Sequence, residues 1–538
     1  MPQPSLISSP QALSCLRRGF DELATLLALT LGPTQGVVLN DRGNKSPEML
    51  TDSATIARRV LELPTRGADA GAMALRQMVW LVHERYGDGA ATAAVLSQAM
   101  VREATKRIVA GANPMLMRQG IEQGVAAASR ALEAQAQPAA SQEMLTGMVT
   151  GMTGDSDLGA VLGEMFDMLG EHAALIIEEF VAPYLEREYL DGGRWPARTA
   201  SRLLMPHEGA EMILQNPRVL VVDQKLETLA QVQPALEATA TAPDKTPLLI
   251  VAREVSGEAL GTLTLNHTHG KLVIGAVTLT NFGFLSDDLS DIALLTGAPV
   301  IAELVGRPPE RVGLADFGRA RRVMLGREGL TIVGGAGDQR EIRQRITELR
   351  SQLSRLSRTD NAWERLRLRA ARLAGGVGIL KIGAYTHTER ALKQEQAKKA
   401  IRTLELALAE GVAPGGGVAY LACVPAVLAT CSDCANEDEL YGVEVVAKAL
   451  EAPFSQIICN HGLIHPAVAV HEVGRLGAGY GFDVLSGRYV PMVEAGVLDC
   501  VSVLRGALEA AASAAAMIIT TDVLVLTSPR RRQRQMNP

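Results

Sequence analysis

The sequence predicts a multidomain protein of mixed α+β and α/β class, in which helical layers from both ends of the chain flank an inserted α/β domain. With 538 residues, the chain is too long for one ordinary hydrophobic core. Helical patterns dominate residues 69–134 and return at 388–410, whereas short apolar runs alternate with helical patterns between residues 218 and 303. Strands that alternate with helices indicate a largely parallel sheet, and hence a separate domain.

The N-terminal part begins with an amphipathic helical pattern. After Ser9-Pro10, which is typical of a cap and first turn, apolar residues recur at steps of three and four from Leu13 to Leu27. The helix is expected to end before Gly32-Pro33. A strand is expected at residues 36–39, and three long helices are expected at 69–86, 90–109 and 114–134.

The remainder of the chain mixes strands and helices. Between residues 135 and 179 we expect a Gly-, Met- and Thr-rich connection, a helix at 158–170 and a strand at 174–177. Strands are expected at 218–223, 247–252, 271–277 and 299–303, with helices at 226–239, 257–267 and 287–296 between them. An apolar stripe from 342 to 356 and a helix at 361–373 predict a helical hairpin, after which a strand runs through residue 382 and a long helix spans 388–410.

Composition excludes several classes of function. Hydrophobic residues make up 47% of the chain and charged residues 21%, as in globular proteins, and a net charge of -6 argues against a nucleic-acid binder. The arginines of the helical hairpin alternate with glutamates and lack an aromatic ladder, so we expect a solvated face there. Neither a run of about 18 apolar residues nor a secretion signal occurs, so we expect no membrane association and a cytoplasmic protein.

Six cysteines leave two interpretations open. Cys431 and Cys434 have the spacing of a metal or redox pair, and Cys459 with His461 would complete a Cys3His zinc site. The second half of that set is a Cys-Asn-His triplet rather than a zinc knuckle. We therefore favour free thiols in a reducing compartment.

Three glycine turns are candidate binding sites. Gly87-Asp88-Gly89 precedes a helix of small residues, so backbone N–H groups and the helix dipole favour an anion there, and Asp88 can hold Mg²⁺. A turn of this kind is also a plain structural junction. The break at Gly32-Pro33 and the glycines at 415–417 are similar turns, and Asp52 is either a helix cap or a second acid near Asp88.

Several of these segments together resemble a known family. In chain order they are Thr30-Leu31-Gly32-Pro33, Asp52, Gly87-Asp88-Gly89 with Thr92, Asn113-Pro114-Met115, Leu373-Ala374-Gly375-Gly376-Val377, Gly415-Gly416-Gly417-Val418-Ala419 and Ile518-Ile519-Thr520-Thr521. Their order and spacing resemble those of group I chaperonins, and the resemblance to a GroEL-type subunit extends from about residue 8 to residue 527. It implies a GroEL-like fold with an equatorial domain of residues 1–134 and 410–538, an intermediate hinge domain of 135–189 and 378–409, and an apical domain of 190–377.

The resemblance further implies a site for ATP and Mg²⁺. Asp88 would bind Mg²⁺, Gly416 would lie against the nucleoside, Asp499 would donate to or accept from the ribose, and the segment that ends in Asp483 would flank the base. The residues implied to surround the nucleotide are Thr30, Leu31, Gly32, Pro33, Asp88, Gly89, Ala90, Ala91, Thr92, Gly416, Asp483 and Asp499.

Two positions are implied to serve hydrolysis, and one departs from the family pattern. They are Asp52 and Lys399, and Lys399 stands where the family has a carboxylate that aligns the attacking water. A protonated lysine cannot act as that base. Ala90 and Ala91 replace two family threonines, and Thr34 with an extra Gln35 replaces a lysine, so we expect ATP binding with impaired hydrolysis. A second hypothesis makes Lys399 a fixed cation for the γ-phosphate, and the site a sensor rather than a motor.

The resemblance also implies an apical surface that binds non-native client proteins and a co-chaperonin. The matching positions are Trp195, Gln233, Leu236, Thr264, Leu265 and Asn266. The aromatic segment of the family aligns here with Arg194, Trp195, Arg198 and Thr199. Polar residues in such a groove reduce the apolar area that a client can bury, so we expect weaker or more selective binding.

Assembly is implied as a homo-oligomeric, heptameric ring, single or double, which can also mix with another chaperonin. The expected inter-ring charge falls on Ser455, and an Arg-rich tail at 528–534 replaces the family's Gly-Met tail. Three readings follow: an ATP-driven folding machine, an ATPase-deficient paralogue that acts as a selective scaffold or ring modulator, and a protein unrelated to chaperonins that binds nucleic acid or metal. The acidic net charge disfavours the third.

Overall fold

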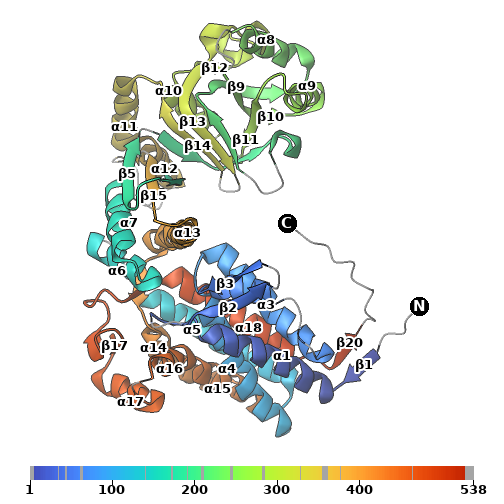
Figure 1. Cartoon of the computed structure of the whole chain (residues 1–538), viewed down its shortest axis with the longest axis vertical. Coiled ribbons are helices and arrows are strands. Elements are labelled where there is room, and N and C mark those ends of the chain that lie inside the picture. Colours follow the sequence, from blue (N-terminus) through green and yellow to red (C-terminus); the bar gives the residue numbers. More distant parts are fainter. Residues whose placement is uncertain are drawn as a thin grey trace. The chain divides into compact units, whose positions relative to one another are not determined.

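The computed structural model divides the chain into two compact units. Unit 1 contains Met1–Asp167 and Ala391–Pro538, and unit 2 contains Met168–Arg390 (Figure 1). The structure describes residues 5–33, 36–42, 45–60, 63, 65–139, 141–170, 174–190, 192–206, 211–242, 246–280, 285–326, 329–353, 355, 361–375, 377–462 and 464–526. Thr34, Gln35 and the tail at 528–534 therefore lie outside the described residues. The three-domain division stays a prediction, because its intermediate segments fall in both units.

Unit 1 is a helical layer built from both ends of the chain. Its helices are α1 (Gln11–Ala28), α2 (Ser53–Arg59), α3 (Arg66–Tyr86), α4 (Ala90–Val109), α5 (Pro114–Ala134), α6 (Gln142–Thr153), α7 (Ser156–Leu169), most of α13 (His387–Glu410), α14 (Val418–Ala429), α15 (Glu437–Ala449), α16 (Ala452–His461), α17 (Pro466–Leu476) and α18 (Val501–Ile519). The predicted bounds of α4 and α5 are confirmed. The first helix begins at Gln11, with Pro10 rather than Ser9 at its cap.

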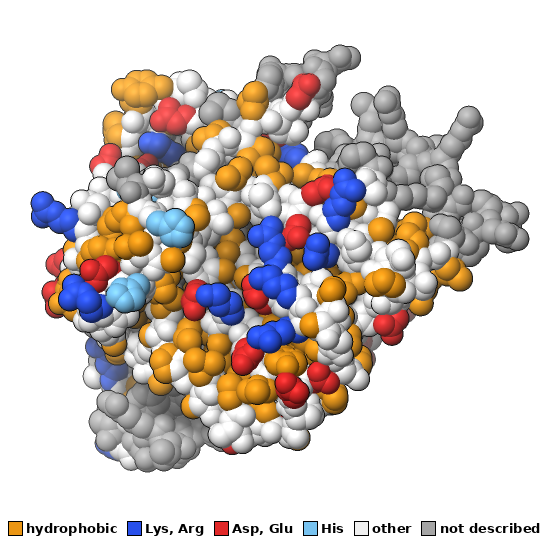
Figure 2. Space-filling view, turned by 90° about the horizontal axis from the view of Figure 1, so that it is seen from below, with side chains coloured by type: hydrophobic (Ala, Val, Ile, Leu, Met, Phe, Trp, Pro, Cys, Tyr) orange, Lys and Arg blue, Asp and Glu red, His pale blue; other side chains and the backbone are white. Residues whose placement is uncertain are grey.

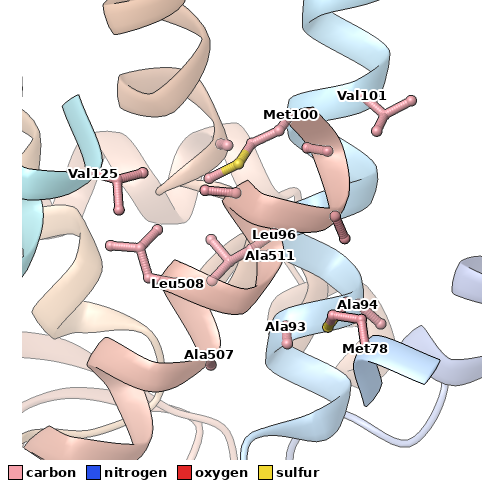
Figure 3. Packing of buried hydrophobic residues seen from close by; sticks show 14 of the residues in the cluster. Met78, Ala93, Ala94, Leu96, Met100, Val101, Val125, Ala507, Leu508 and Ala511 are labelled. Carbon is pink, nitrogen blue, oxygen red and sulfur yellow. The ribbon is translucent and has the colours of Figure 1, made fainter. Parts of the chain in front are cut away.

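Helix α18 lies in the centre of this layer. Ala507, Leu508 and Ala511 of α18 face Leu96 and Met100 of α4 in the buried core (Figure 3). Among the described residues, α18 is the one helix long and apolar enough to span a membrane by length and composition. Because 67% of its most apolar window is buried inside the protein, it is a core helix here.

Glycines let helices α1 and α3 approach closely. A Cβ atom on Gly19 would lie 1.7 Å from the carbonyl oxygen of Ala68, and one on Gly71 would lie 1.9 Å from that of Leu16. Real Cβ atoms cannot come so near to backbone oxygen. The absence of side chains at these two positions therefore sets the spacing of the helix pair.

The described residues of unit 1 also form four two-stranded sheets. In order they are β1 (Ser5–Ser8) with β20 (Val523–Leu526), β2 (Val38–Arg42) with β3 (Lys45–Leu50), β16 (Val412–Pro414) with β19 (Leu498–Cys500), and β17 (Tyr480–Asp483) with β18 (Arg488–Pro491). All four pairs are antiparallel. The first of them joins the two ends of the chain, with Ser5 opposite Leu526.

Unit 2 contains the predicted α/β domain. Its strands are β4 (Ala174–Glu179), β5 (Leu185–Leu190), β6 (Gly192–Trp195), β7 (Ala197–Thr199), β8 (Met212–Gln215), β9 (Arg218–Leu226), β10 (Leu248–Val255), β11 (Ile274–Leu279), β12 (Val300–Ile301), β13 (Gly318–Gly326), β14 (Gly329–Gly335) and β15 (Val377–Ile382). Strands β9, β10, β11 and β12 pair in parallel, as predicted, and antiparallel strands extend this sheet on both sides. A separate three-stranded sheet has the order β4-β15-β5.

The helices of unit 2 include the predicted hairpin. They are α8 (Leu229–Ala240), α9 (Gly257–Thr268), α10 (Leu285–Thr296), α11 (Gln339–Leu353) and α12 (Asn361–Gly375). The expected solvated face is wrong for Arg369, which is 4% exposed and forms a two-pronged ion pair with buried Asp291 of α10. Arg372 pairs likewise with Asp288, so part of the arginine-rich hairpin ties α12 to α10.

Surface charge elsewhere is mixed in sign. On the face seen in Figure 2, Lys and Arg side chains lie beside Asp and Glu side chains and are separated by apolar groups. A nucleic-acid site generally presents a continuous basic stripe.

Candidate functional site

The Gly87-Asp88-Gly89 turn joins α3 to α4. Gly87 ends α3 with φ 79° and Gly89 precedes α4 with φ 83°, and both are left-handed conformations that favour glycine. A Cβ atom on Gly89 would lie 2.7 Å from Cγ1 of Val503 in α18. The turn is therefore pressed against the core, while the carboxylate of Asp88 is exposed next to the N-terminus of α4. Free N–H groups at such a helix start favour an anion.

A pocket lies directly beside this turn. Its lining residues are Asp88, Gly89, Thr92, Met148, Met152, Thr403, Tyr420, Leu498, Asp499, Cys500, Val503, Leu504 and Ala507. Four of the residues implied to bind nucleotide, Asp88, Gly89, Thr92 and Asp499, thus meet in one pocket although up to 411 positions separate them (499 minus 88). The other implied nucleotide residues are not among those that line it.

Asp499 is electrostatically coupled to Asp88. Burial, and secondly the charge of Asp88, raise the pKa of Asp499 to about 7, whereas a hydrogen bond from the backbone N–H of Gly416 works in the opposite direction. Two carboxylates that repel each other in a pocket favour a cation or a proton between them. The donor set is suited to Mg²⁺, which takes oxygen ligands from one or two carboxylates.

Thr403 is a pocket residue that sequence reasoning missed. It lies on α13, is 2% exposed, and its hydroxyl has no hydrogen-bond partner within the described part of the chain. Buried hydroxyl groups nearly always have a partner, so this one is suited to a ligand or a water molecule in the pocket. A lone threonine in a helical pattern gave no signal for this role.

The turn at residues 30–33 is held by hydrogen bonds within the protein. Thr30 is buried and its hydroxyl donates to the carbonyl oxygen of Leu27 over 2.7 Å. Asn460 of α16 donates to the carbonyl oxygens of Ala28 and Leu31, over 2.9 and 2.8 Å. The Thr30 hydroxyl is therefore bonded to the last turn of helix α1 in this structure.

Asp52 serves both as a helix cap and as an acid in the site. Its Oδ2 accepts hydrogen bonds from the backbone N–H and the hydroxyl of Thr55, over 2.8 and 2.7 Å, and so caps α2. Its Oδ1 forms an ion pair with the ammonium of Lys399 on α13. Burial opposes ionisation, but the charge of Lys399 and the hydrogen bonds from Lys399 and Thr55 outweigh it, so the pKa of Asp52 is lowered.

His83, on the last turn of α3, interacts electrostatically with the charged residues of the site. Burial lowers its pKa, and Asp52, Lys399 and Asp88 act on it electrostatically. The Asp52–Lys399 pair therefore lies close to the Asp88 turn. This agrees with a contact at Gly87, where a Cβ atom would lie 3.3 Å from the carbonyl oxygen of Lys399.

Comparison with known proteins identifies the family. Residues 23–529 match the TCP-1/cpn60 chaperonin family. The chain belongs to this family. The fold is similar to that of the chaperonin gp146 from the bacteriophage EL 2 (Pseudomonas aeruginosa), solved in the presence of ATP-BeFx, with a TM-score of 0.76 and 18% identity over 97% of this chain and 99% of that one. A second crystal form of gp146 gives 0.68 and 17% over the same shares. The GroEL-like fold class is confirmed.

The client-binding positions expected in this chaperonin are only partly at the surface. Trp195 is fully buried in the core of unit 2, where its ring packs over Gly193, so its assignment as a surface residue is wrong in this structure. Leu236 is 8% exposed and faces the same core. Leu265, in contrast, is 59% exposed on α9.

The polar side chains expected at the client surface of α8 and α9 form hydrogen bonds within their own helices. Gln233 is exposed and donates to Glu237. The hydroxyl of Thr264 and the amide of Asn266 donate to the carbonyl oxygens of Leu260 and Thr262, one turn earlier. Helices α8 and α9 therefore carry the polar side chains that the sequence predicted for them.

The zinc alternative is not supported in this chaperonin. Cys431 and Cys434 lie in a 3-10 turn (Thr430–Asp433) and at its end, whereas Cys459 and His461 lie on α16. Within the described ranges, no three His, Cys, Asp or Glu side chains form a group that could hold a metal ion. All six cysteines are free thiols.

Asp483 stabilises a turn in this chaperonin. Its carboxylate accepts hydrogen bonds from the backbone N–H groups of Leu485 and Ser486, over 3.0 and 3.2 Å, and so shapes the turn between β17 and β18. The implied position of Asp483 beside a nucleotide base stays a prediction.

Proposed function

We propose that this protein is a divergent chaperonin of the GroEL type that binds ATP and Mg²⁺, assists the folding of non-native proteins, and hydrolyses ATP slowly. The ion pair between Lys399 and Asp52 carries the proposal. The pair supports slow hydrolysis because Lys399 brings a cation to Asp52, and because it occupies one oxygen of that candidate acid.

Nucleotide binding is supported by the pocket beside the Asp88 turn. The N-terminus of α4 offers backbone donors for phosphate, Asp88 offers an exposed carboxylate for Mg²⁺, and Asp499 and Thr403 offer oxygen atoms deeper in the pocket. The related bacteriophage chaperonin was crystallised in the presence of an ATP analogue, ATP-BeFx. Bound Mg²⁺ would neutralise phosphate charge and orient the terminal phosphate.

Slow hydrolysis follows from the charges at the site. A general base contributes roughly 10² to 10⁴ in rate, and neither group here suits that role. The ammonium of Lys399 has no lone pair while protonated. Asp52 has a lowered pKa because of Lys399 and its helix-capping bonds, which makes its carboxylate a weak base.

Ring assembly is supported by apolar residues on the small sheets of unit 1. Leu6, Val523 and Val525 of β1 and β20 are at least 50% exposed, and so is Leu39 of β2. Exposed apolar residues on two separate sheets suit a repeated contact between copies of one chain. We place the protein in the cytoplasm as a homo-oligomeric ring of seven subunits per ring, with polar helices α8 and α9 that select among clients.

The deciding experiment compares ATP binding with steady-state ATP hydrolysis. It uses the wild type, Lys399→Asp and the control Lys398→Asp, since Lys398 is an exposed neighbour that pairs with Glu395 on its own helix. We expect the wild type to bind ATP with little turnover, and Lys399→Asp alone to raise turnover by at least tenfold. Ordinary turnover in the wild type would contradict the proposal. Binding without turnover, combined with refolding activity only in mixed rings, would instead favour an ATPase-deficient modulator of another chaperonin.

A further inference from the structure

The ammonium of Lys399 is held in place by a carboxylate that is itself fixed. Thr55 binds Oδ2 of Asp52 through two hydrogen bonds, which leaves Oδ1 for Lys399. The two side chains are 25% and 21% exposed. Because Lys399 belongs to α13 and Asp52 caps α2, the pair is anchored on two separate helices. Lys399 therefore differs from a surface lysine, whose ammonium moves freely in solvent.

The segment of α13 that carries Lys399 lies against the turn before α4, where the nucleotide phosphates are proposed to bind. The backbone of Lys399 packs against Gly87, the residue before Asp88. Asp52, Lys399 and Asp88 all act electrostatically on His83, in the last turn of α3, so the three charges lie in one neighbourhood. A phosphate at the start of α4 would thus approach a cation that is already positioned.

An ammonium group has three N–H donors, and among the residues that the structure describes Asp52 is the one partner of Lys399, which leaves donors for a ligand. We propose that Lys399 donates to the terminal phosphate of a bound nucleoside triphosphate while Asp52 keeps it in position, so that the site distinguishes ATP from ADP without hydrolysis. The inference rests on the proposed nucleotide binding. Lys399 is then a specificity-determining residue and Asp52 a positioning residue.

The chemistry of the pair supports this assignment. Lysine binds phosphate as a compact point charge, and hydrogen bonds between charged groups are about twice as strong as neutral ones. ADP lacks the phosphate that would reach the ammonium. The loss of one charge-assisted hydrogen bond generally lowers affinity by about tenfold to a hundredfold. No covalent bond forms or breaks, so the signal depends on nucleotide binding and release alone.

Calorimetric titration with a non-hydrolysable ATP analogue and with ADP, both with Mg²⁺, tests the inference on the full chain. The quantity is the ratio of the two affinities. We expect a ratio of at least ten in the wild type, a ratio near one in Lys399→Met, and an intermediate ratio in Asp52→Asn, where the lysine remains but is no longer fixed. Lys399→Arg keeps the charge and should keep most of the ratio, and the matched control Lys398→Met should equal the wild type.

The outcomes separate this inference from the proposed function. If Lys399→Met keeps the wild-type ratio, or if the wild type binds both nucleotides equally, Lys399 does not read the terminal phosphate, although nucleotide binding itself stands. If the wild type binds neither nucleotide, the proposed function fails and the inference fails with it. Thermal melts without nucleotide identify any variant that does not fold.

Discussion

The ammonium of Lys399 and the carboxylate of Asp52 form an ion pair although the two residues are 347 positions apart in the sequence. The contact ties helix α13 to the start of α2, next to the Asp88 turn. It also gives Asp52 two partners at once, the N-terminus of its own helix and a lysine from a distant one. A helix cap and a site residue are therefore the same side chain.

A double-mutant cycle measures how strongly this pair stabilises unit 1. Both side chains are mostly shielded from solvent, so Asp52→Asn and Lys399→Met should show a coupling free energy of about 1 to 2 kcal/mol, between the values of exposed and buried pairs. Urea unfolding of the two single variants and the double variant provides the measurement. Strict additivity of the two single effects would mean that the ion pair does not contribute to folding.

The stability of the metal-free and nucleotide-free protein should depend on Asp499 near neutral pH. Its folded-state pKa of about 7 exceeds the ordinary value of 3.8, so the folded state holds the proton more tightly. The charged carboxylate therefore costs stability progressively as the pH rises from about 4 to about 7, after which the cost is constant. Asp499→Asn removes this cost, and its gain in melting temperature over the wild type should grow from pH 4 to pH 7. A gain that does not vary with pH would contradict the raised pKa of Asp499.

Because α1 and α3 pack closely, adding one methyl group at their contact should greatly lower the free energy of unfolding. Gly71→Ala would place a Cβ atom 1.9 Å from the carbonyl oxygen of Leu16, and backbone cannot yield cheaply. We expect a loss of about 2 to 3 kcal/mol in the free energy of unfolding. Gly474→Ala is the matched control, since Gly474 is an exposed helical residue of α17 with no atom within 4 Å of the added group, and should stabilise by about 0.5 to 1 kcal/mol.

The buried pair of Arg369 and Asp291 should be essential to unit 2. Their side chains are 5% and 4% exposed, and Arg369 also contacts Asp287. Arg369→Met leaves the Asp291 carboxylate without its counter-ion, which generally costs about 3 to 5 kcal/mol. Arg350→Met, on the exposed face of α11, should change stability by less than about 0.5 kcal/mol. Equal melting curves for the two variants would refute this account.

Thiol reactivity should separate exposed from buried cysteines. Burial raises the pKa of Cys423 to about 12 and that of Cys500 to about 11, whereas Cys459 is exposed. Because the thiolate is the reactive species, a disulfide reagent should label Cys459 first, and Cys423 and Cys500 only after unfolding. Mass spectrometry of the labelled peptides identifies the sites. Cys459→Ser should remove the fast phase.

Local signals in the sequence predicted much of unit 1. Gly89 before a run of small residues, and Asn113 with Pro114, fix the starts of α4 and α5. Helix α6 was missed because its Gly, Met and Thr residues favour a loop. Its packing against α7 explains why it forms. A Cβ atom on Gly159 would lie 2.2 Å from the hydroxyl of Thr150, and one on Gly163 would lie 2.2 Å from that of Thr146. The two glycines of α7 therefore allow α6 to pack closely against it.

The candidate site was only partly predictable for a related reason. Asp88 and its turn carry a local pattern, whereas the partner of Lys399, the orphan hydroxyl of Thr403 and the environment of His83 depend on contacts between distant helices. For Trp195 the sequence did give a prediction, but the structure contradicts it. Its alignment suggested a surface position, but β6 turns this ring into the core above Gly193.

The pairing of β1 with β20 has a consequence for biosynthesis. Unit 2 occupies one continuous stretch, Met168–Arg390, whereas unit 1 needs both ends of the chain and the late helix α18 in its centre. Domains generally fold as units during translation. The inserted unit can therefore fold during translation, but the N-terminal helices keep apolar faces uncovered until α18 and β20 have been synthesised. A protein of the chaperonin family is thus itself a demanding substrate for assisted folding.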